Sequence, residues 1–207
     1  YKNCNRRGII AINIEEGDEL IAVHQTTGHN EIVLISDDGR SARFDEEQVR
    51  STGRASIGVK GMNLDRADEG AGARAVVRSM TLVDPACTLL VAASNGIGKR
   101  TPYDDEDGHV FRKTSRGAKG VIAIKLKEGT TVAGALSVRD DDEVMLLTQA
   151  GQAIRTRAKE IRTTGRNAQG VKLMNLAAGE SIIGISRVVR TDEDTEAAKD
   201  TTGADGE

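Results

Sequence analysis

The sequence predicts an all-β, propeller-like fold of about four blade-like units, each roughly 50 residues long. Three observations support this prediction. Sequence markers return at constant spacing, apolar runs are short and end at turn glycines, and glycine is abundant while proline is scarce, with 23 glycines and 2 prolines in 207 residues. Units of this length that are rich in short strands are typical of a radial propeller, whereas a β-helix has much shorter rungs.

A twelve-residue phrase occurs twice with eight identical letters, as "GRASIGVKGMNL" at 53–64 and "GRNAQGVKLMNL" at 165–176. These two copies lie 112 positions apart, and two further pairs of segments have the same offset. A constant offset over three markers indicates an internal duplication rather than chance composition. The further pairs are "GIIAI" (8–12) with "GVIAI" (120–124), and "EIVLISDDGRSAR" (31–43) with "EVMLLTQAGQAIR" (143–155).

Each period of 112 residues contains two similar units. The run "TLLVAASNGIGKR" (88–100) resembles the segments at 31–43 and 143–155, because each has an apolar stretch, a turn glycine and an arginine four residues later. The repeating unit is therefore about 50 residues long. Four glycines precede strand-like stretches at intervals of 50, 62 and 50 residues: Gly8, Gly58, Gly120 and Gly170.

Along the chain, the first expected strand is "GIIAINI" (8–14), a nearly continuous apolar run. "EIVLIS" (31–36) is the next, and Asp38-Gly39 after it predicts a two-residue hairpin turn because glycine tolerates positive φ. The stretch "FDEEQVRSTG" (44–53) is the first of two that can carry a short helical turn.

The later elements follow the same scheme. Their apolar runs are too short for typical helices, and their near-continuous apolarity indicates burial on both faces, as in sheets that stack face to face. The expected strands are "TLLVAAS" (88–94) before Asn95-Gly96, "GVIAIKL" (120–126), and "EVMLLT" (143–148) before Ala150-Gly151, and the second helical turn lies in "TRAKEIRTTG" (156–165).

The net charge of −3 conceals an uneven distribution along the chain. Residues 191–207 contain seven acids and one lysine, a net charge of −6, which leaves +3 for residues 1–190. This acidic tail is polar and buries too little apolar surface to offset the entropy lost on ordering, so we expect it to be disordered. We place the blade-like units near 6–52, 53–115, 116–164 and 165–190 and leave open whether they exchange strands.

The sequence argues against several classes of protein. No apolar run approaches the roughly 18 residues that span a bilayer, so we expect a soluble, cytoplasmic protein without a membrane partner. The chain begins with Tyr1 and has no signal-peptide layout, which favours a fragment of a longer polypeptide. Cys4 and Cys87 have no clustered histidines, so we expect reduced thiols and no metal site. The sequence has no P-loop, nucleophile elbow or HExxH motif, and we predict no catalytic residues.

Three stretches resemble the repeats in the C-terminal domain of the DNA gyrase A subunit family. They are "DDEVMLLTQAGQAIRTRAKEIRTTGRNAQGV" (141–171), "IEEGDELIAV" (14–23) and "SNGIGKRT" (94–101), and the resemblance extends over 6–190. The acidic tail is also similar to the end of that subunit. One departure concerns the basic, glycine-rich box of the first blade, because "NRRGIIA" (5–11) shares only Arg-Arg-Gly with it and is not assigned to it.

The resemblance implies a β-pinwheel, a propeller-like ring whose blades exchange strands, of which this chain would supply about the last four of six blades. It also implies that duplex DNA bends around a basic perimeter, in support of ATP-dependent negative supercoiling by the holoenzyme. The implied partners are double-stranded DNA, the rest of the gyrase A subunit and the gyrase B subunit, in the nucleoid. No cofactor is implied for this chain, since ATP and Mg²⁺ act elsewhere in the holoenzyme, as does the catalytic tyrosine.

Cations recur at turns and strand ends of the repeats. Arg43, Arg100 and Arg155 each follow a hairpin glycine, so one cation per blade would form an evenly spaced outer belt. Such a belt suits phosphate contacts, which position DNA without reading its sequence. The candidate DNA-binding residues are Arg40, Arg43, Arg54, Lys60, Lys99, Arg100, Arg112, Lys113, Arg116, Lys119, Arg155, Arg157, Arg162, Arg166 and Lys172.

Two other functions stay open at this point. The chain can be the C-terminal domain of a topoisomerase IV relative, which binds DNA and wraps it less, or a propeller that serves as a protein-interaction platform. Single-stranded DNA is disfavoured, because aromatic residues make up only 2% of the chain and base stacking depends on them. The acidic tail can compete with DNA for the cations or can simply increase solubility.

Overall fold

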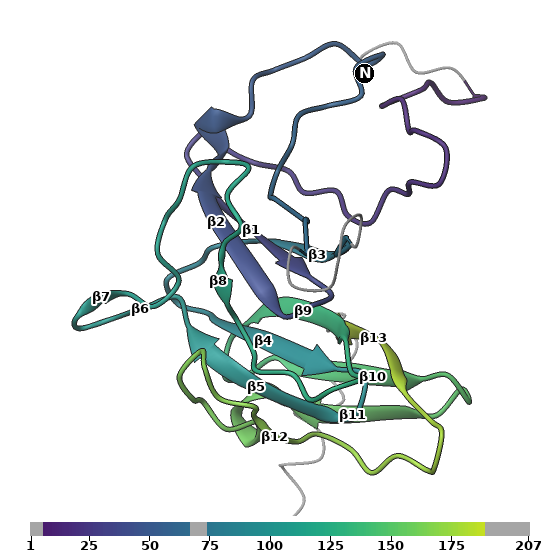
Figure 1. Cartoon of the computed structure of the whole chain (residues 1–207), viewed down its shortest axis with the longest axis vertical. Helices are drawn as coiled ribbons and strands as arrows, with labels where there is room; N and C mark the ends of the chain where they lie inside the picture. Colours follow the sequence, from purple (N-terminus) through teal and green to yellow (C-terminus); the bar gives the residue numbers. More distant parts are fainter. Residues whose placement is uncertain (1–5, 67–73, 189–207) are drawn as a thin grey trace, which may run out of the picture.

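The computed structural model describes residues 6–66 and 74–188, which form antiparallel sheets with almost no helix (Figure 1). The all-β prediction is confirmed. Among the described residues, two 3-10 helices directly follow strands, η1 (Glu46–Gln48) and η3 (Ala158–Glu160), and they lie inside the two stretches expected to carry helical turns. In this part of the chain, no helix has the length and apolar character that a bilayer crossing requires.

Within residues 6–66 and 74–188, the strands form three sheets and one small hairpin. The first sheet has the order β3-β1-β2-β8, the second β12-β5-β4-β9 and the third β11-β10-β13. Their strands, with those of the separate hairpin β6–β7, are β1 (Glu31–Ser36), β2 (Arg40–Asp45), β3 (Val77–Leu82), β4 (Thr88–Ala93), β5 (Ile97–Pro102), β6 (Asp104–Asp105), β7 (Gly108–His109), β8 (Val121–Ile122), β9 (Val132–Val138), β10 (Glu143–Thr148), β11 (Ala153–Arg157), β12 (Val171–Lys172) and β13 (Ile182–Arg187).

Each sheet is built on a hairpin whose turn ends in glycine. Gly39, Gly96 and Gly151 have φ of 82°, 82° and 84°, and no described residue other than glycine has positive φ. The predicted two-residue turns are therefore wrong in detail, because such turns need positive φ at their first or at both central positions. Three residues separate the strands of the first two hairpins and four separate those of the third, and glycine takes the left-handed position at or next to the end of each turn.

The two four-stranded sheets are completed by very short strands from distant parts of the chain. β8 pairs with β2, and β12 pairs with β5. Gly120 and Gly170 lead into these strands, and a Cβ at either would lie 2.1 Å from the Ser41 carbonyl oxygen or 2.3 Å from that of Gly98. These glycines therefore allow a contact between backbones that no other residue permits.

The core lies between sheets that are stacked in series. Along β4, Leu89 and Val91 belong to the apolar cluster shared with β1, whereas Leu90 packs with Val144 of β10. Both faces of β4 are thus buried, as its near-continuous apolar sequence predicts. The second sheet is the middle layer, with the first sheet on one side and the third on the other (Figure 1).

The expected strand at 8–14 is not formed. This stretch has no regular structure, and Ile10 and Ile14 expose 69% and 51% of their surface. The physical reason is that a strand needs a partner edge, and none of the described residues provides one for this segment. The predicted unit boundaries do not separate the sheets either, since the first sheet combines 31–45, 77–82 and 121–122. The acidic tail at 191–207 lies outside the described residues.

Candidate nucleic-acid interface

Arg43 lies in the interior and joins the first sheet to a later part of the chain. Its guanidinium donates to Glu31 on the neighbouring strand, to both carboxylate oxygens of Asp104 at 2.7 and 3.0 Å, and to the carbonyl oxygens of Tyr103 and Phe111. Burial alone would lower the pKa of Arg43, but the hydrogen bonds to Asp104 and Glu31 outweigh it and raise the pKa. The contact with the Arg43 guanidinium in turn lowers the pKa of Asp104.

Arg100 and Lys99 are buried in the equivalent part of the second sheet. The Arg100 guanidinium donates to the carbonyl oxygen of Ile161 at 2.9 Å and forms an ion pair with Asp140. The Lys99 ammonium donates to the carbonyl oxygens of Gly165 and Arg166. All these partners lie at least 40 positions further along the chain, so the two cations connect units rather than face solvent.

Arg155, the third arginine of this series, is half exposed and pairs with Glu143 on the neighbouring strand. No segment among the described residues packs over β11 as 103–114 packs over β2. The prediction that Arg43, Arg100 and Arg155 form one outer belt is therefore wrong for the first two. They are buried because the next part of the chain covers them, which the spacing of the arginines does not reveal.

A different repeated feature does lie at the surface: three loops that we call the loop row, comprising residues 53–58, 115–120 and 165–170. The chain leaving each loop bonds to the next one. The Gly61 carbonyl accepts from the Gly117 amide at 2.7 Å, and the Lys125 amide donates to the Ala168 carbonyl at 3.2 Å. The segment around Asn13 contacts the first loop in the same way, at Ser56. The three loops therefore follow one another in space as well as in sequence.

Each loop carries an arginine at its second position: Arg54, Arg116 and Arg166. Arg54 is exposed, and its guanidinium lies 3.5 Å from the Ile10 carbonyl. Arg116 is half buried and donates to the carbonyl oxygens of Gln48 and Lys60 at 3.1 and 2.5 Å. Arg166 is also half buried, so equivalent positions differ in how much of the cation reaches solvent.

A second series of arginines precedes the loops: Arg50, Arg112 and Arg162, each four residues before the loop arginine, and all exposed. Phe111 and Ile161, directly before two of them, are buried and anchor the backbone there. Arg50 was missed among the sequence candidates. The repeat offset of 112 positions that relates it to Arg162 would have found it.

The other candidates differ in solvent exposure and in whether an acidic side chain pairs with them. Lys60 and Lys172 are exposed at equivalent positions after the first and third loops, and Lys119 is half buried in the second. Lys113 pairs with Glu31 and Asp45, which raises its pKa. The remaining two, Arg40 and Arg157, lie beside Asp38 and Glu160.

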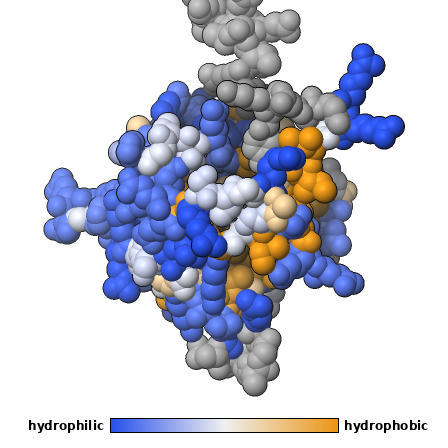
Figure 2. All heavy atoms as spheres, turned by 90° about the horizontal axis from the view of Figure 1, so that it is seen from above, coloured by the Kyte–Doolittle hydropathy of each residue, from blue (hydrophilic) through white to orange (hydrophobic). Residues whose placement is uncertain are grey.

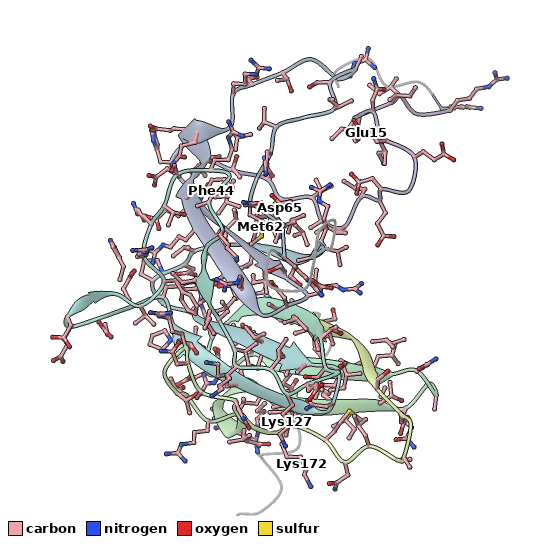
Figure 3. All side chains as sticks on the ribbon, in the orientation of Figure 1. Glu15, Phe44, Met62, Asp65, Lys127 and Lys172 are labelled. Atoms are coloured by element: carbon pink, nitrogen blue, oxygen red, sulfur yellow. The ribbon has the colours of Figure 1, made fainter. Side chains whose placement is uncertain are left out.

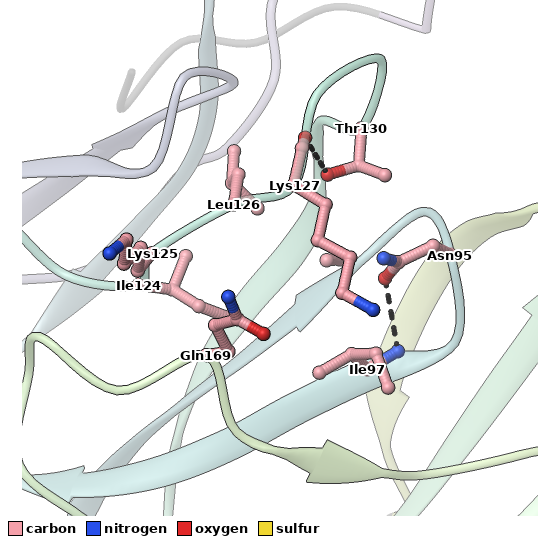
Figure 4. A pocket seen from close by; sticks show the side chains of 9 residues that line it. Asn95, Ile97, Ile124, Lys125, Leu126, Lys127, Thr130 and Gln169 are labelled. Atoms are coloured by element: carbon pink, nitrogen blue, oxygen red, sulfur yellow. Dashed lines mark hydrogen bonds between the residues drawn. The ribbon is translucent and has the colours of Figure 1, made fainter.

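Lys125 and Lys127 add positive charge beside the loop row. They line a cavity of about 10 Å³ between the second sheet and the third loop, with Asn95 and Gln169 (Figure 4). This space holds about one water molecule. Figure 3 shows Lys127 and Lys172 at the end of the molecule opposite Glu15.

The surface contains both polar and apolar regions. One face is mainly hydrophilic with an apolar patch on one side (Figure 2). The exposed apolar side chains include Leu20, Val23 and Ile57, whereas the arginines of the loop row and those preceding it recur at matched positions. Repeated cations on adjacent loops can neutralise a row of phosphates. In the described part of these loops, no nucleophilic side chain is paired with a general base in a way that would point to catalysis.

A protein-family model described as the DNA gyrase C-terminal domain, beta-propeller, matches residues 1–27, 30–76, 88–139 and 142–188. The chain belongs to this family. The three loops of the loop row lie within the matched residues. The predicted resemblance and the propeller-type fold are both confirmed.

Curated relatives agree with this family. The chain is 41% identical over 197 residues to the DNA gyrase A subunit of Deinococcus deserti. The aligned region covers 93% of this chain and 23% of that protein. It is 41% identical over 190 residues to the corresponding gyrase protein of Salmonella typhimurium, covering 91% of this chain and 20% of that protein. The chain thus spans between a fifth and a quarter of the length of these relatives.

Solved structures show the same fold. The C-terminal domain of DNA topoisomerase IV superposes with a TM-score of 0.80 at 24% identity, covering 100% of this chain and 61% of that one. The DNA gyrase A C-terminal domain superposes with a TM-score of 0.75 at 25% identity, covering 89% of this chain and 59% of that one. Both neighbours are thus longer than this member of the DNA gyrase C-terminal domain family.

Proposed function

We propose that this chain is a non-catalytic, duplex-DNA-binding module of the gyrase A subunit, and that it bends DNA along the loop row. The observation that carries the proposal is the threefold recurrence of exposed arginine before three loops that are hydrogen-bonded in series. Membership of the gyrase C-terminal domain family supports it. Bending of this kind would support ATP-dependent negative supercoiling by the holoenzyme.

The proposed contact set differs from the one expected from sequence. Arg43, Lys99 and Arg100 are omitted because they are buried and already hydrogen-bonded, and Arg50 is added. Five further candidates are omitted because acids or backbone carbonyls engage their charges: Arg40, Lys113, Arg116, Arg155 and Arg157. The principal contacts are the exposed Arg112 and Arg162 with Arg50, and the set is completed by Arg54, Lys60, Lys119, Arg166 and Lys172. Cations spread over several units suit a sequence-independent grip on the phosphate backbone.

The energetics favour a distributed site over a single patch. Bending 20–30 base pairs by 40–90° costs on the order of 1–6 kcal/mol by elastic estimates. Each cation that neutralises a phosphate releases counterions, and several such contacts together can offset the bending cost. The affinity for duplex DNA must then fall steeply as the salt concentration rises, since added salt opposes counterion release.

The same proposal assigns the remaining parts of the reaction to other regions. DNA cleavage by a catalytic tyrosine and ATP hydrolysis with Mg²⁺ would take place elsewhere in the gyrase A and B subunits. This chain would need no cofactor and would act in the cytoplasm, on the nucleoid, with double-stranded DNA and the remainder of gyrase as its partners.

One alternative is a relative of topoisomerase IV, whose C-terminal domain has the same fold. Such a relative would bind DNA and wrap it less. A protein-interaction platform without a DNA role is a further alternative. It predicts binding that is indifferent to salt and no preference for duplex.

The test is a duplex binding and bending assay over a salt series with the full chain. Between about 50 and 200 mM salt, a site with 6–10 phosphate contacts loses about 10³- to 10⁵-fold in affinity. Removing Arg50, Arg112 and Arg162 together should lower the slope of log affinity against log salt by about one per cation. Arg139→Ala is the control, because Arg139 is exposed, lies off the loop row and pairs with Asp84.

The outcomes separate the functions. A steep salt slope with strong bending supports the gyrase-like module, and a steep slope with weak bending supports the topoisomerase IV-like alternative. A flat salt response would exclude the proposed DNA function and leave the protein-interaction platform.

A further inference from the structure

The second and third loops of the row are held in place by different residues. In the second loop, the residue that holds the loop in place is Arg116 itself. Its guanidinium donates to the carbonyl oxygens of Gln48 and Lys60, and its backbone amide donates to the Gln48 side chain at 2.7 Å. Two of the five guanidinium donors are held by backbone carbonyls, which fixes the group against the protein, so Arg116 acts mainly as an internal brace.

In the third loop a buried lysine provides the brace. The Lys99 ammonium donates to the carbonyl oxygens of Gly165 and Arg166 at 2.7 and 2.6 Å, and the side chain is fully buried. Burying an ammonium is costly unless it is hydrogen-bonded, so these two contacts specify where the loop backbone sits. The corresponding position of the first sheet is Ala42, directly before Arg43, which cannot make such contacts.

The consequence is a difference between Arg116 and Arg166. Among the described residues, no hydrogen bond or ion pair engages the Arg166 guanidinium, whereas that of Arg116 is occupied. Burial lowers the pKa of Lys99 to about 8, with a smaller contribution from the nearby positive charge of Arg166. The repulsion between the two cations disfavours any inward turn of the Arg166 guanidinium.

We propose that Lys99 is a positioning residue for DNA binding: it braces the 165–170 loop from inside and so leaves Arg166 free to contact a phosphate. This inference rests on the proposed DNA-binding function. Lys99, expected from the sequence to touch DNA, would instead act through Arg166. Arg116 and Arg166 would then differ in strength as DNA contacts although they occupy equivalent positions.

The test is a double-mutant cycle measured by duplex affinity over a salt series. Arg166→Ala should weaken binding several-fold and lower the salt slope by about one. Lys99→Met keeps most of the length of the side chain but removes the ammonium, and it should weaken binding by a similar factor. Combined with Arg166→Ala, Lys99→Met should add nothing further, because its effect passes through Arg166.

The matched control is Arg112→Ala, which removes an exposed cation preceding a different loop. Lys99→Met and Arg112→Ala should weaken binding additively, since the two sites share no contacts. Amide hydrogen exchange of residues 165–170 should accelerate in Lys99→Met and not in Arg166→Ala. If Lys99→Met does not fold, Lys99→Gln replaces it in the same cycle, because it keeps a polar group in the interior while its shorter, uncharged side chain loses the two ammonium contacts.

The possible failures are distinguishable. If the unaltered chain binds duplex with a steep salt slope but Arg166→Ala keeps full affinity and slope, the positioning role is wrong while the proposed function stands. If Lys99→Met weakens binding equally in the Arg166→Ala background, Lys99 acts by another route and the inference also falls. A flat salt response of the unaltered chain removes the proposed function itself.

Discussion

Arg43 and Arg155 follow equivalent turn glycines, and each forms an ion pair with an acid on the opposite strand, Glu31 or Glu143. Their surroundings differ. Arg43 is 3% exposed and also holds Asp104, whereas the side chain of Arg155 is 52% exposed. The same residue type at the same place in the repeat thus connects sheets in one unit and lies at the surface in another.

This difference predicts unequal effects on stability. Arg43→Met should lower the free energy of unfolding by about 3 kcal/mol, the low end for breaking a buried ion pair, because Asp104 keeps some contact with solvent. Arg155→Met should change it by no more than about 1 kcal/mol, as for exposed pairs. Urea unfolding measures both, and equal losses would contradict the role assigned to Arg43.

At the level of elements, the short strands β8 and β12 are the distinctive feature. Each contributes only two residues to its sheet, so its position depends on the close backbone approach at the preceding glycine. Gly120 combines a φ of +75° with a space that a side chain cannot enter. A two-residue strand forms few hydrogen bonds with its neighbour, so these bonds cannot offset a displacement of the preceding backbone.

The prediction is that Gly120→Ala destabilises the fold far more than Gly129→Ala. Gly129 has almost the same φ, +72°, but a Cβ there would meet nothing within 4 Å. Both changes force alanine into the left-handed region at about 1–2 kcal/mol, and Gly120→Ala adds a steric overlap of about 1–3 kcal/mol. Thermal unfolding of the two variants measures the difference. Equal shifts in Tm would show that the contact with Ser41 is unimportant.

At the scale of the whole molecule, the three sheets depend on one another. β8 joins 121–122 to the first sheet, β12 joins 171–172 to the second, and the apolar clusters lie between sheets rather than within them. No sheet can bury its faces alone. Neighbouring units of a repeat fold gain stability mainly through such shared interfaces.

We therefore expect the described region to unfold in one cooperative transition. Tyr103 is buried in the cluster between the first and second sheets and serves as a local probe in a Tyr1→Phe background, while far-UV circular dichroism reports all strands. The two signals should give coincident urea midpoints, as two-state unfolding requires. A separate Tyr103 transition would show that the sheets unfold independently.

Much of the fold could be predicted because local sequence encodes it. The hairpins around Gly39, Gly96 and Gly151 follow from positive φ at glycine, and both 3-10 turns lie where they were expected. The site was predicted less well. Arg112 and Arg162 are exposed as expected, but the fate of Arg43 and Arg100 depends on residues about 40 to 70 positions away, as the ranges of their hydrogen bonds show.

The sequence by itself determined the β class, the duplication and the turn positions, because each depends on residue type and spacing within one unit. Only the tertiary structure decided which cations reach solvent, that 8–14 forms no strand, and that 121–122 and 171–172 complete sheets begun much earlier in the chain. The physical reason is that exposure and strand pairing are properties of what packs against a residue. Equivalent local sequences receive different partners in successive units.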